Sequence, residues 1–79
     1  MCQVNNQRRS RLKQAVELLN RVSSMVSSVL DEEEDAFDNI PENLQGSERY
    51  EKTEDAIDCL NDASENIDAA IEKLNEAAS

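Results

Sequence analysis

The chain has 79 residues, with 18 acidic and eight basic side chains and a formal net charge of -10 at pH 7. It has one Phe, one Tyr and no Trp, so platforms for base stacking are scarce and direct nucleic-acid binding is not expected. A chain of this length has room for one domain with a thin core, while its single Pro and single Gly permit long helices.

No apolar run approaches the ~18 residues of a membrane span. The apolar stretch after the basic N-terminus is interrupted by Glu17, Asn20 and Arg21, which the core of a signal peptide would exclude. The two cysteines, Cys2 and Cys59, do not form the pattern of a disulfide framework. We therefore expect a cytoplasmic protein with reduced thiols and no membrane partner.

Residues 1–6 are predicted to be a frayed N-terminus and residues 7–36 to form the first helix of a single domain, residues 1–79. Apolar residues at 3,4 spacing indicate a seam for packing against another helix. The predicted seam consists of Leu12, Ala15, Leu19, Val22, Val26 and Val29. Further apolar residues flank it on both sides, so the apolar arc is broader than one partner helix needs. We expect a homo-oligomer, with a dimer favoured, and an interface formed by Leu18, Val22, Met25, Val29 and Leu30.

The first turns of this helix contain a basic cluster. Its members are Arg8, Arg9, Arg11 and Lys13. In an antiparallel hairpin the cluster would lie beside the acidic end of the second helix, near Asp68, Glu72 and Glu76. That pairing favours the antiparallel topology. An alternative role for the cluster is to bind an anionic small molecule at a site that assembled subunits share.

The hinge is predicted to span residues 37–47, with Asn39, Pro41 and Gly46 as helix breakers. We expect Phe37, Ile40 and Leu44 to fold over the end of the bundle. In the run from Asp31 to Glu42, the carboxylates of Asp31, Glu33, Asp35 and Glu42 fall at ligand positions of a calcium loop. Because it has Ala36 where such a loop needs Gly, we interpret the run as a solvated helix end and predict no metal site.

The second helix is predicted over residues 48–77, with Ser47 as its N-cap. Its seam follows the 3,4 spacing without a slip: Tyr50, Thr53, Ile57, Leu60, Ser64, Ile67, Ile71, Leu74 and Ala78. Alanines at positions 56, 63, 70 and 77 precede seam residues and allow a neighbouring backbone to approach closely. Two helices of about 45 Å joined by a short connection predict an all-α, antiparallel two-helix hairpin with heptad-like packing, associating into a four-helix or larger bundle.

Acidic residues form an outer ridge opposite the seam of the second helix. The ridge consists of Glu48, Glu51, Asp55, Asp58, Asp62, Glu65, Glu72 and Glu76. Acids at this spacing are separated by about 5 Å along the axis, comparable to the phosphate spacing of duplex DNA. One interpretation is a nucleic-acid mimic that binds a host protein with a basic surface. The other is the ordinary solvated face of an acidic helix.

Enzyme chemistry has little support in this sequence. There is no His, no Gly-rich phosphate loop and no recognisable nucleophile signature. The carboxylates lie on faces expected to be wet, where pKa values are not tuned apart as in acid–base catalysis. We predict no catalytic residues and no cofactor.

The string from Asp31 to Glu51, followed by Ala-Ile-Asp-Cys-Leu at residues 56–60, resembles a family of short uncharacterised acidic helical proteins from phages and mobile elements of Gram-positive bacteria. The shared features are an acidic helix end, an Asn-apolar-Pro-Glu turn, a Ser-Glu helix start and an Ala-Ile-Asp repeat. Tyr50 replaces a Gly common in those sequences, and the basic N-terminus is particular to this chain. The resemblance implies a mobile-element origin and brings no known activity.

These features together lead to three hypotheses about function. The first is a non-catalytic protein-binding module, such as an anti-defence inhibitor that blocks a host immune or nucleic-acid-handling protein through the acidic ridge. The second is an oligomer that sequesters an anionic small molecule through its N-terminal arginines. The third is a purely structural assembly protein.

Overall fold

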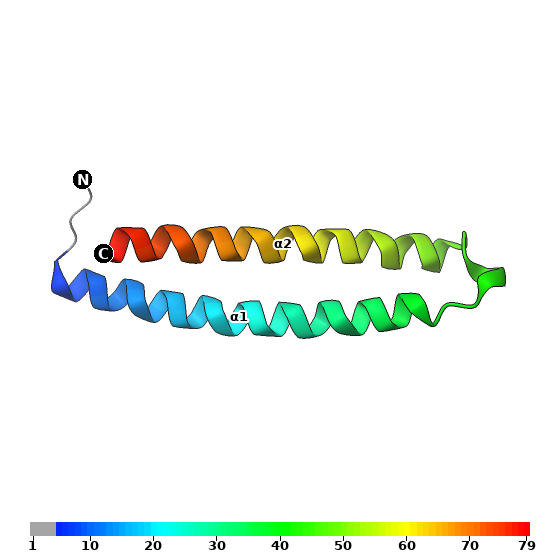
Figure 1. Cartoon of the computed structure of the whole chain (residues 1–79), viewed down its shortest axis with the longest axis horizontal. Helices are drawn as coiled ribbons and strands as arrows, with labels where there is room; N and C mark the ends of the chain where they lie inside the picture. Colours follow the sequence, from blue (N-terminus) through cyan, green and yellow to red (C-terminus); the bar gives the residue numbers. More distant parts are fainter. Residues whose placement is uncertain (1–4) are drawn as a thin grey trace.

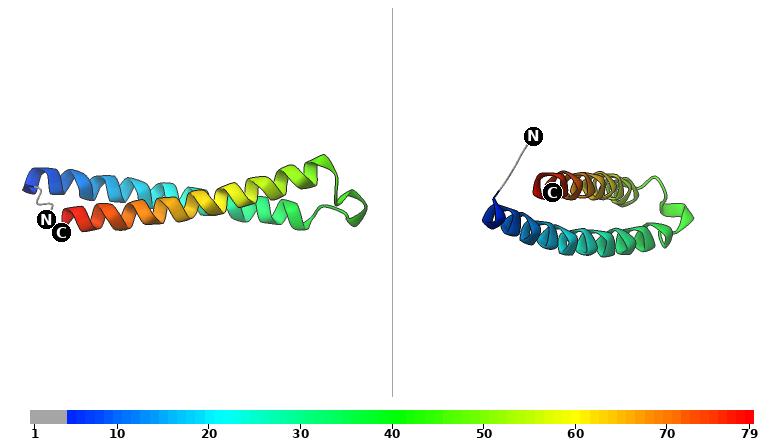
Figure 2. Two further views of the ribbon diagram at one scale, coloured as in Figure 1. Left: turned by 90° about the horizontal axis from the view of Figure 1, so that it is seen from above. Right: turned by 60° about the vertical axis from the view of Figure 1, so that its left-hand side comes forward.

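The computed structural model describes residues 5–79 and contains two long helices, α1 (Asn6–Asp38) and α2 (Glu48–Ala78). A short 3-10 helix, η1 (Glu42–Leu44), lies in the connection between them. The two helices lie side by side and antiparallel, so the start of α1 and the end of α2 are at the same end of the molecule (Figure 1). They cross at a shallow angle in Figure 2. The predicted all-α helical hairpin is confirmed.

The ends of α1 lie slightly beyond the predicted range of 7–36. The side chain of Asn5 accepts a hydrogen bond of 2.8 Å from the backbone N–H of Arg8, which caps the helix and lets it begin at Asn6. Asn5 and Asn6 therefore belong to the helix start and not to a frayed terminus. The rest of that predicted terminus, residues 1–4, lies outside the described residues.

An aromatic contact accounts for the C-terminal extension of α1 to Asp38. The rings of Phe37 and Tyr50 pack with their centroids 4.5 Å apart, which joins the end of α1 to the start of α2. The last turn of α1 contains no basic residue, so no favourable interaction between a cationic side chain and the helix dipole stabilises this end. The ring contact therefore acts at this helix end together with the local helix-ending residues Asn39 and Pro41.

The structure also corrects the predicted seam of α1. The partly covered residues along this helix are Arg9, Leu12, Val16, Leu19, Ser23, Val26, Leu30, Glu33 and Phe37, together with Ala15 beside them. Val22 and Val29, predicted in the seam, are exposed, and Ser23 and Leu30 take their places. Both alternatives have 3,4 spacing, but only the observed one reaches Phe37 and thereby allows the ring contact with Tyr50.

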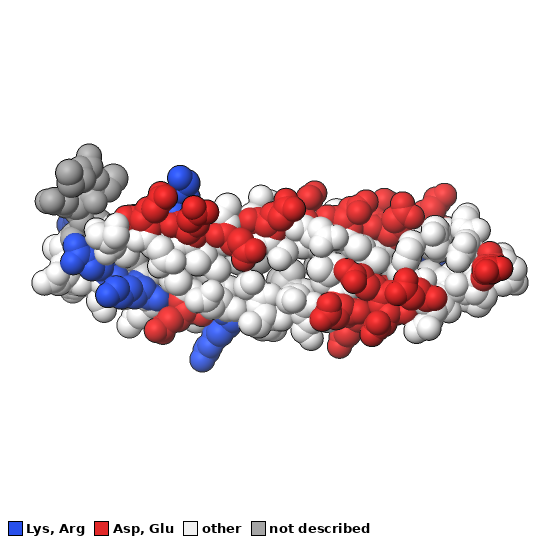
Figure 3. Space-filling view, viewed as in Figure 1, with Lys and Arg blue, Asp and Glu red and all other residues white. Residues whose placement is uncertain are grey.

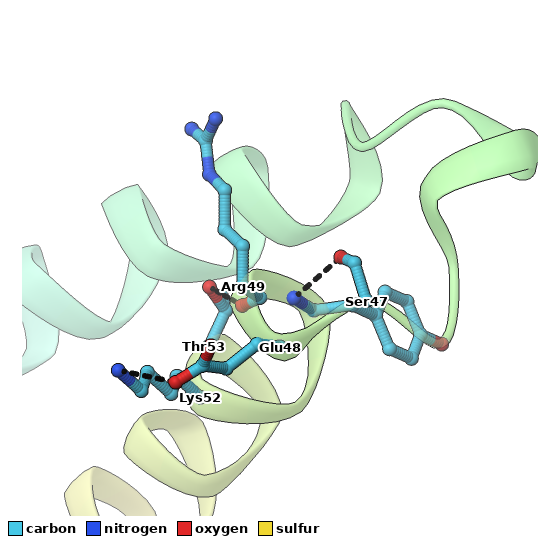
Figure 4. A network of polar contacts seen from close by, with 6 residues as sticks. Ser47, Glu48, Arg49, Lys52 and Thr53 are labelled. Carbon is cyan, nitrogen blue, oxygen red and sulfur yellow. Dashed lines mark hydrogen bonds and ion pairs between the residues drawn. The ribbon is translucent and has the colours of Figure 1, made fainter.

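The seam of α2 lies where the spacing predicts it, since all nine of its residues are buried or partly covered. Ser47 accepts a hydrogen bond of 3.2 Å at its hydroxyl from the N–H of Tyr50 (Figure 4). The same view shows Lys52 paired with Glu48 at 3.0 Å on the first turns. The neighbouring Ala56, Ala63 and Ala77 are partly covered, whereas Ala70 is exposed.

The hinge turns the chain within nine residues, 39–47. Ile40 is buried against the bundle end at 9% exposure, as predicted, but Leu44 lies in η1 and is 48% exposed, so the prediction that Leu44 covers the bundle end is wrong. The N–H of Leu44 donates to the carbonyl of Pro41 over 2.9 Å, a hydrogen bond of the tight turn that forms η1. Gly46 then reverses the chain with a φ of 99°.

Replacing Gly46 by Ala should lower the free energy of unfolding by about 1–2 kcal/mol, because an L-residue at this positive φ is strained. No atom lies within 4 Å of the position a Cβ would occupy, so backbone conformation alone carries the cost. Urea denaturation followed by circular dichroism measures it. Gln45→Ala is the matched control, since Gln45 has an ordinary φ of -70°. Equal free energies of unfolding for the two variants would contradict the positive φ of Gly46 in this turn.

The hairpin has a very thin core. Among residues 5–79, only Ile40 and Ala78 are buried, with 9% and 7% of their surface exposed. The accessible surface is 6168 Å², whereas a compact monomer of this mass exposes about 4,800 Å². The radius of gyration is 17.8 Å and the extents are 59 × 20 × 13 Å, against about 12 Å for a globular chain of this length. The hairpin is therefore elongated, and its exposed surface includes the large apolar side chains of Leu18, Val22, Met25, Val29 and Leu44.

Candidate functional site

The acidic ridge of α2 faces away from α1. Every one of its eight residues precedes a seam residue by two positions, which is about 200° around the helix. All eight are exposed. Figure 3 shows acidic side chains along the outer edge of α2 and on the part of α1 nearest the hinge. The structure thus brings the predicted ridge residues together on one continuous surface, interrupted only at Ala69.

Few ridge carboxylates have a cationic neighbour. Glu48 pairs with Lys52, and Glu76 pairs with Lys73 at 3.4 Å. Within residues 5–79, no ammonium or guanidinium group lies within 4.0 Å of the other six carboxylates: Glu51, Asp55, Asp58, Asp62, Glu65 and Glu72. These six span about 32 Å of helix. They form an unneutralised line of negative charge available to a cationic surface.

Folding concentrates the net charge in one half of the hairpin. Residues 31–58, which surround the hinge, carry 12 acidic and two basic side chains, a net charge of -10. The other half, formed by the start of α1 and the end of α2, is neutral by the same count. Figure 3 shows the basic side chains of α1 at the end remote from the hinge. The molecule is therefore strongly polarised along its length.

The basic cluster does not converge in a single chain. Arg8 and Arg11 line one open hollow with Leu12 and Ala15, whereas Arg9 is partly covered at the end of the inner seam. The Nε atom of Arg9 is buried without a hydrogen-bond partner. Lys13 is exposed on another side of α1. A site for an anion built from all four would need a second chain, so this alternative stays a prediction.

The expected pairing of this cluster with the acidic end of α2 is not formed. The ion pairs within residues 5–79 are the two on α2, and neither joins the helices. No carboxylate near Asp68, Glu72 or Glu76 comes within 4.0 Å of a basic group on α1. The hairpin topology therefore rests on the seam and the hinge, and the cations of α1 are left without acidic partners in the described chain.

A second surface, the apolar side face, is formed by residues that directly precede the seam positions. On α1 it contains Arg8, Arg11, Ala15, Leu18, Val22, Met25, Val29, Glu32 and Ala36. On α2 it contains the alanines at 56, 63, 70 and 77 and Cys59, together with the polar Arg49, Lys52, Asn66 and Lys73. In an antiparallel pair, positions one residue before each seam fall on the same side of both helices. Residues that directly follow the seams form the opposite side, and on both helices these are polar.

The large residues of the apolar side face are exposed. Leu18 is 57% exposed and Met25 is 69% exposed, with Val22 and Val29 above 40%. These are four of the five residues predicted for an oligomer interface. Leu30, the fifth, is partly covered and belongs to the α1 seam that contacts α2. It lies seven residues, or two helical turns, before Phe37, which packs against Tyr50.

The described residues offer little for bound ions or membranes. The acidic run after Leu30 is helical as far as Asp38, so it does not wrap around a cation. No group of three potential ligand side chains within residues 5–79 could hold a metal ion. Neither described helix combines the length and apolar character that crossing a membrane requires.

Comparisons with protein-family models, with curated proteins and with solved structures find no match to this chain.

Proposed function

We propose that this protein is a non-catalytic binding module that occupies a basic surface of another protein through the acidic ridge of α2. The observation that carries the proposal is the line of six exposed, unpaired carboxylates on the side of α2 remote from α1. Such a surface attracts a cationic groove over long range and raises the association rate. A rigid helix also fixes the spacing of the charges before binding.

The resemblance to acidic proteins of phages and mobile elements supports one version of this proposal, an inhibitor of a host immune or nucleic-acid-handling protein. The partner's groove would then be one that normally accepts a phosphate backbone. Duplex DNA and the acidic ridge would compete for it. This version predicts that DNA releases the captured partner.

Changing Asp55, Asp58 and Asp62 to Asn and Glu65 to Gln should weaken binding to the captured partner by about 2 kcal/mol, or about 30-fold in Kd, on the basis of about 0.5 kcal/mol per exposed ion pair. The free energy of unfolding should change by less than about 0.5 kcal/mol, since all four side chains are exposed. Tagged protein immobilised in a lysate of a Gram-positive bacterium, followed by mass spectrometry and titration of the identified partner, measures the effect.

The matched control removes four acidic charges from α1: Glu17→Gln, Asp31→Asn, Glu34→Gln and Asp38→Asn. It changes the net charge by the same amount, and all four residues are exposed. If both variants lose equal affinity, net charge and not the ridge mediates binding. If neither loses affinity, the ridge is an ordinary solvated face, and the proposal fails.

A further inference from the structure

We infer that the apolar side face is covered by a second copy of this chain, with α1 of each copy packed antiparallel against α1 of the other. Leu18, Val22, Met25 and Val29 recur on α1 at 4,3,4 spacing, the spacing of a seam that packs against a helix. This second seam lies beside the seam that contacts α2, not opposite it. The inference does not depend on the partner proposed for the acidic ridge, which lies on another side of the hairpin.

The distribution of charge along this second seam identifies its occupant. The seam begins with Arg8 and Arg11, continues through apolar residues, and reaches Glu32 and Ala36 at its other end, with Asp35 adjacent. A strip that is basic at one end and acidic at the other complements its own copy only when the two run antiparallel. Two-fold symmetry then uses the same contact twice, as in the interfaces of most homodimers.

The antiparallel arrangement has a definite register. Val22 of one copy lies level with Met25 of the other, and Leu18 lies level with Val29. Counting outward from these pairs, Arg11 is level with residue 36 of the second copy, within one turn of Glu32 and Asp35. The cations of α1 that have no acidic partner in the single hairpin thereby gain one.

The parallel alternative is disfavoured by the polarisation of the molecule. It would place the two hinge halves, each with a net charge of -10, beside one another. In the antiparallel arrangement each hinge half lies beside the neutral half of the other copy. On the same face, the small Ala56, Ala63 and Ala70 of α2 permit its close approach to the second hairpin.

The uncovered area is sufficient for such an interface. The chain exposes roughly 1,400 Å² more than the ~4,800 Å² expected of a compact monomer of its mass. A stable interface of ordinary size buries about 800 Å² on each partner. The excess is larger than one partner's share of such an interface, so a second copy on one face has enough surface to cover.

Charge reversal tests the inference. Arg8→Glu with Arg11→Glu, or Glu32→Arg with Asp35→Arg, should each weaken the dimer by about tenfold or more, because like charges then meet at both ends. All four changes in one chain should restore the wild-type dissociation constant to within about threefold. Each of the two reversals places charges that the α1 dipole favours, acids near its N-terminus or bases near its C-terminus. Loss of helix is therefore not the expected cause of weaker dimerisation. Sedimentation equilibrium measures association, and circular dichroism checks the helices.

Cross-linking tests the direction of packing independently. With Cys2 and Cys59 changed to Ser, a Leu18→Cys chain is mixed with a Val29→Cys chain and oxidised. A disulfide between the two different chains supports the antiparallel register, since their Cα atoms would lie within disulfide range. Predominant linkage of two Leu18→Cys chains would overturn it. A wild-type chain that is monomeric at ~1 mM, or a fourfold charge variant as weak as the single reversals, would also overturn the inference.

Discussion

Changing Leu19 to Asp is expected to abolish cooperative folding, whereas the same change at the adjacent Leu18 leaves the hairpin helical. Leu19 lies in the seam against α2, while Leu18 is 57% exposed on the apolar side face. The Asp at position 19 loses roughly 1.5–3 kcal/mol of apolar burial and adds the desolvation cost of an unpaired charge. The total approaches the ~4–12 kcal/mol that stabilises a domain of this size.

Far-UV circular dichroism during thermal unfolding distinguishes the two variants. The Leu19→Asp chain should show little helical signal at 25 °C and no cooperative transition on heating. The Leu18→Asp chain should keep its helical signal and lose only the stability that a second copy contributes through mass action. If the two substitutions had equal effects, the observed choice between the two possible α1 seams would be contradicted.

Truncating Ile40 to Ala should lower the free energy of unfolding by about 3 kcal/mol, because it removes the most buried large side chain among residues 5–79 and leaves a cavity under the hinge. For a domain of this length that corresponds to a fall in Tm of roughly 12–24 °C. Differential scanning calorimetry measures it directly.

Leu44→Ala is the control for this prediction, since Leu44 lies in the same hinge and is 48% exposed. It should cost less than about 1 kcal/mol. Similar losses at the two positions would mean that η1 folds over the bundle end, contrary to its position in the structure.

Most of the architecture could be predicted from periodicity and helix-ending residues. The uninterrupted 3,4 spacing of α2 identifies its seam, because only one set of positions on that helix is consistently apolar or small. Ser47 is the N-cap and Gly46 the reversal point, as local backbone chemistry requires. The acidic ridge follows from the same periodicity, since its residues lie opposite a seam that is already assigned.

The tertiary structure alone decided which face of α1 meets α2. Leu12, Leu19 and Val26 belong to both possible seams, so spacing could not choose between them. The observed seam is the one that continues to Phe37, about 20 Å along the axis from Val22, where Phe37 packs against Tyr50. It places Ser23 inside and leaves Val22 and Val29 outside. The sequence by itself determined a polarised helical hairpin, and the packing of α1 against α2, with the ring contact at its hinge end, determined which of its apolar residues remain exposed.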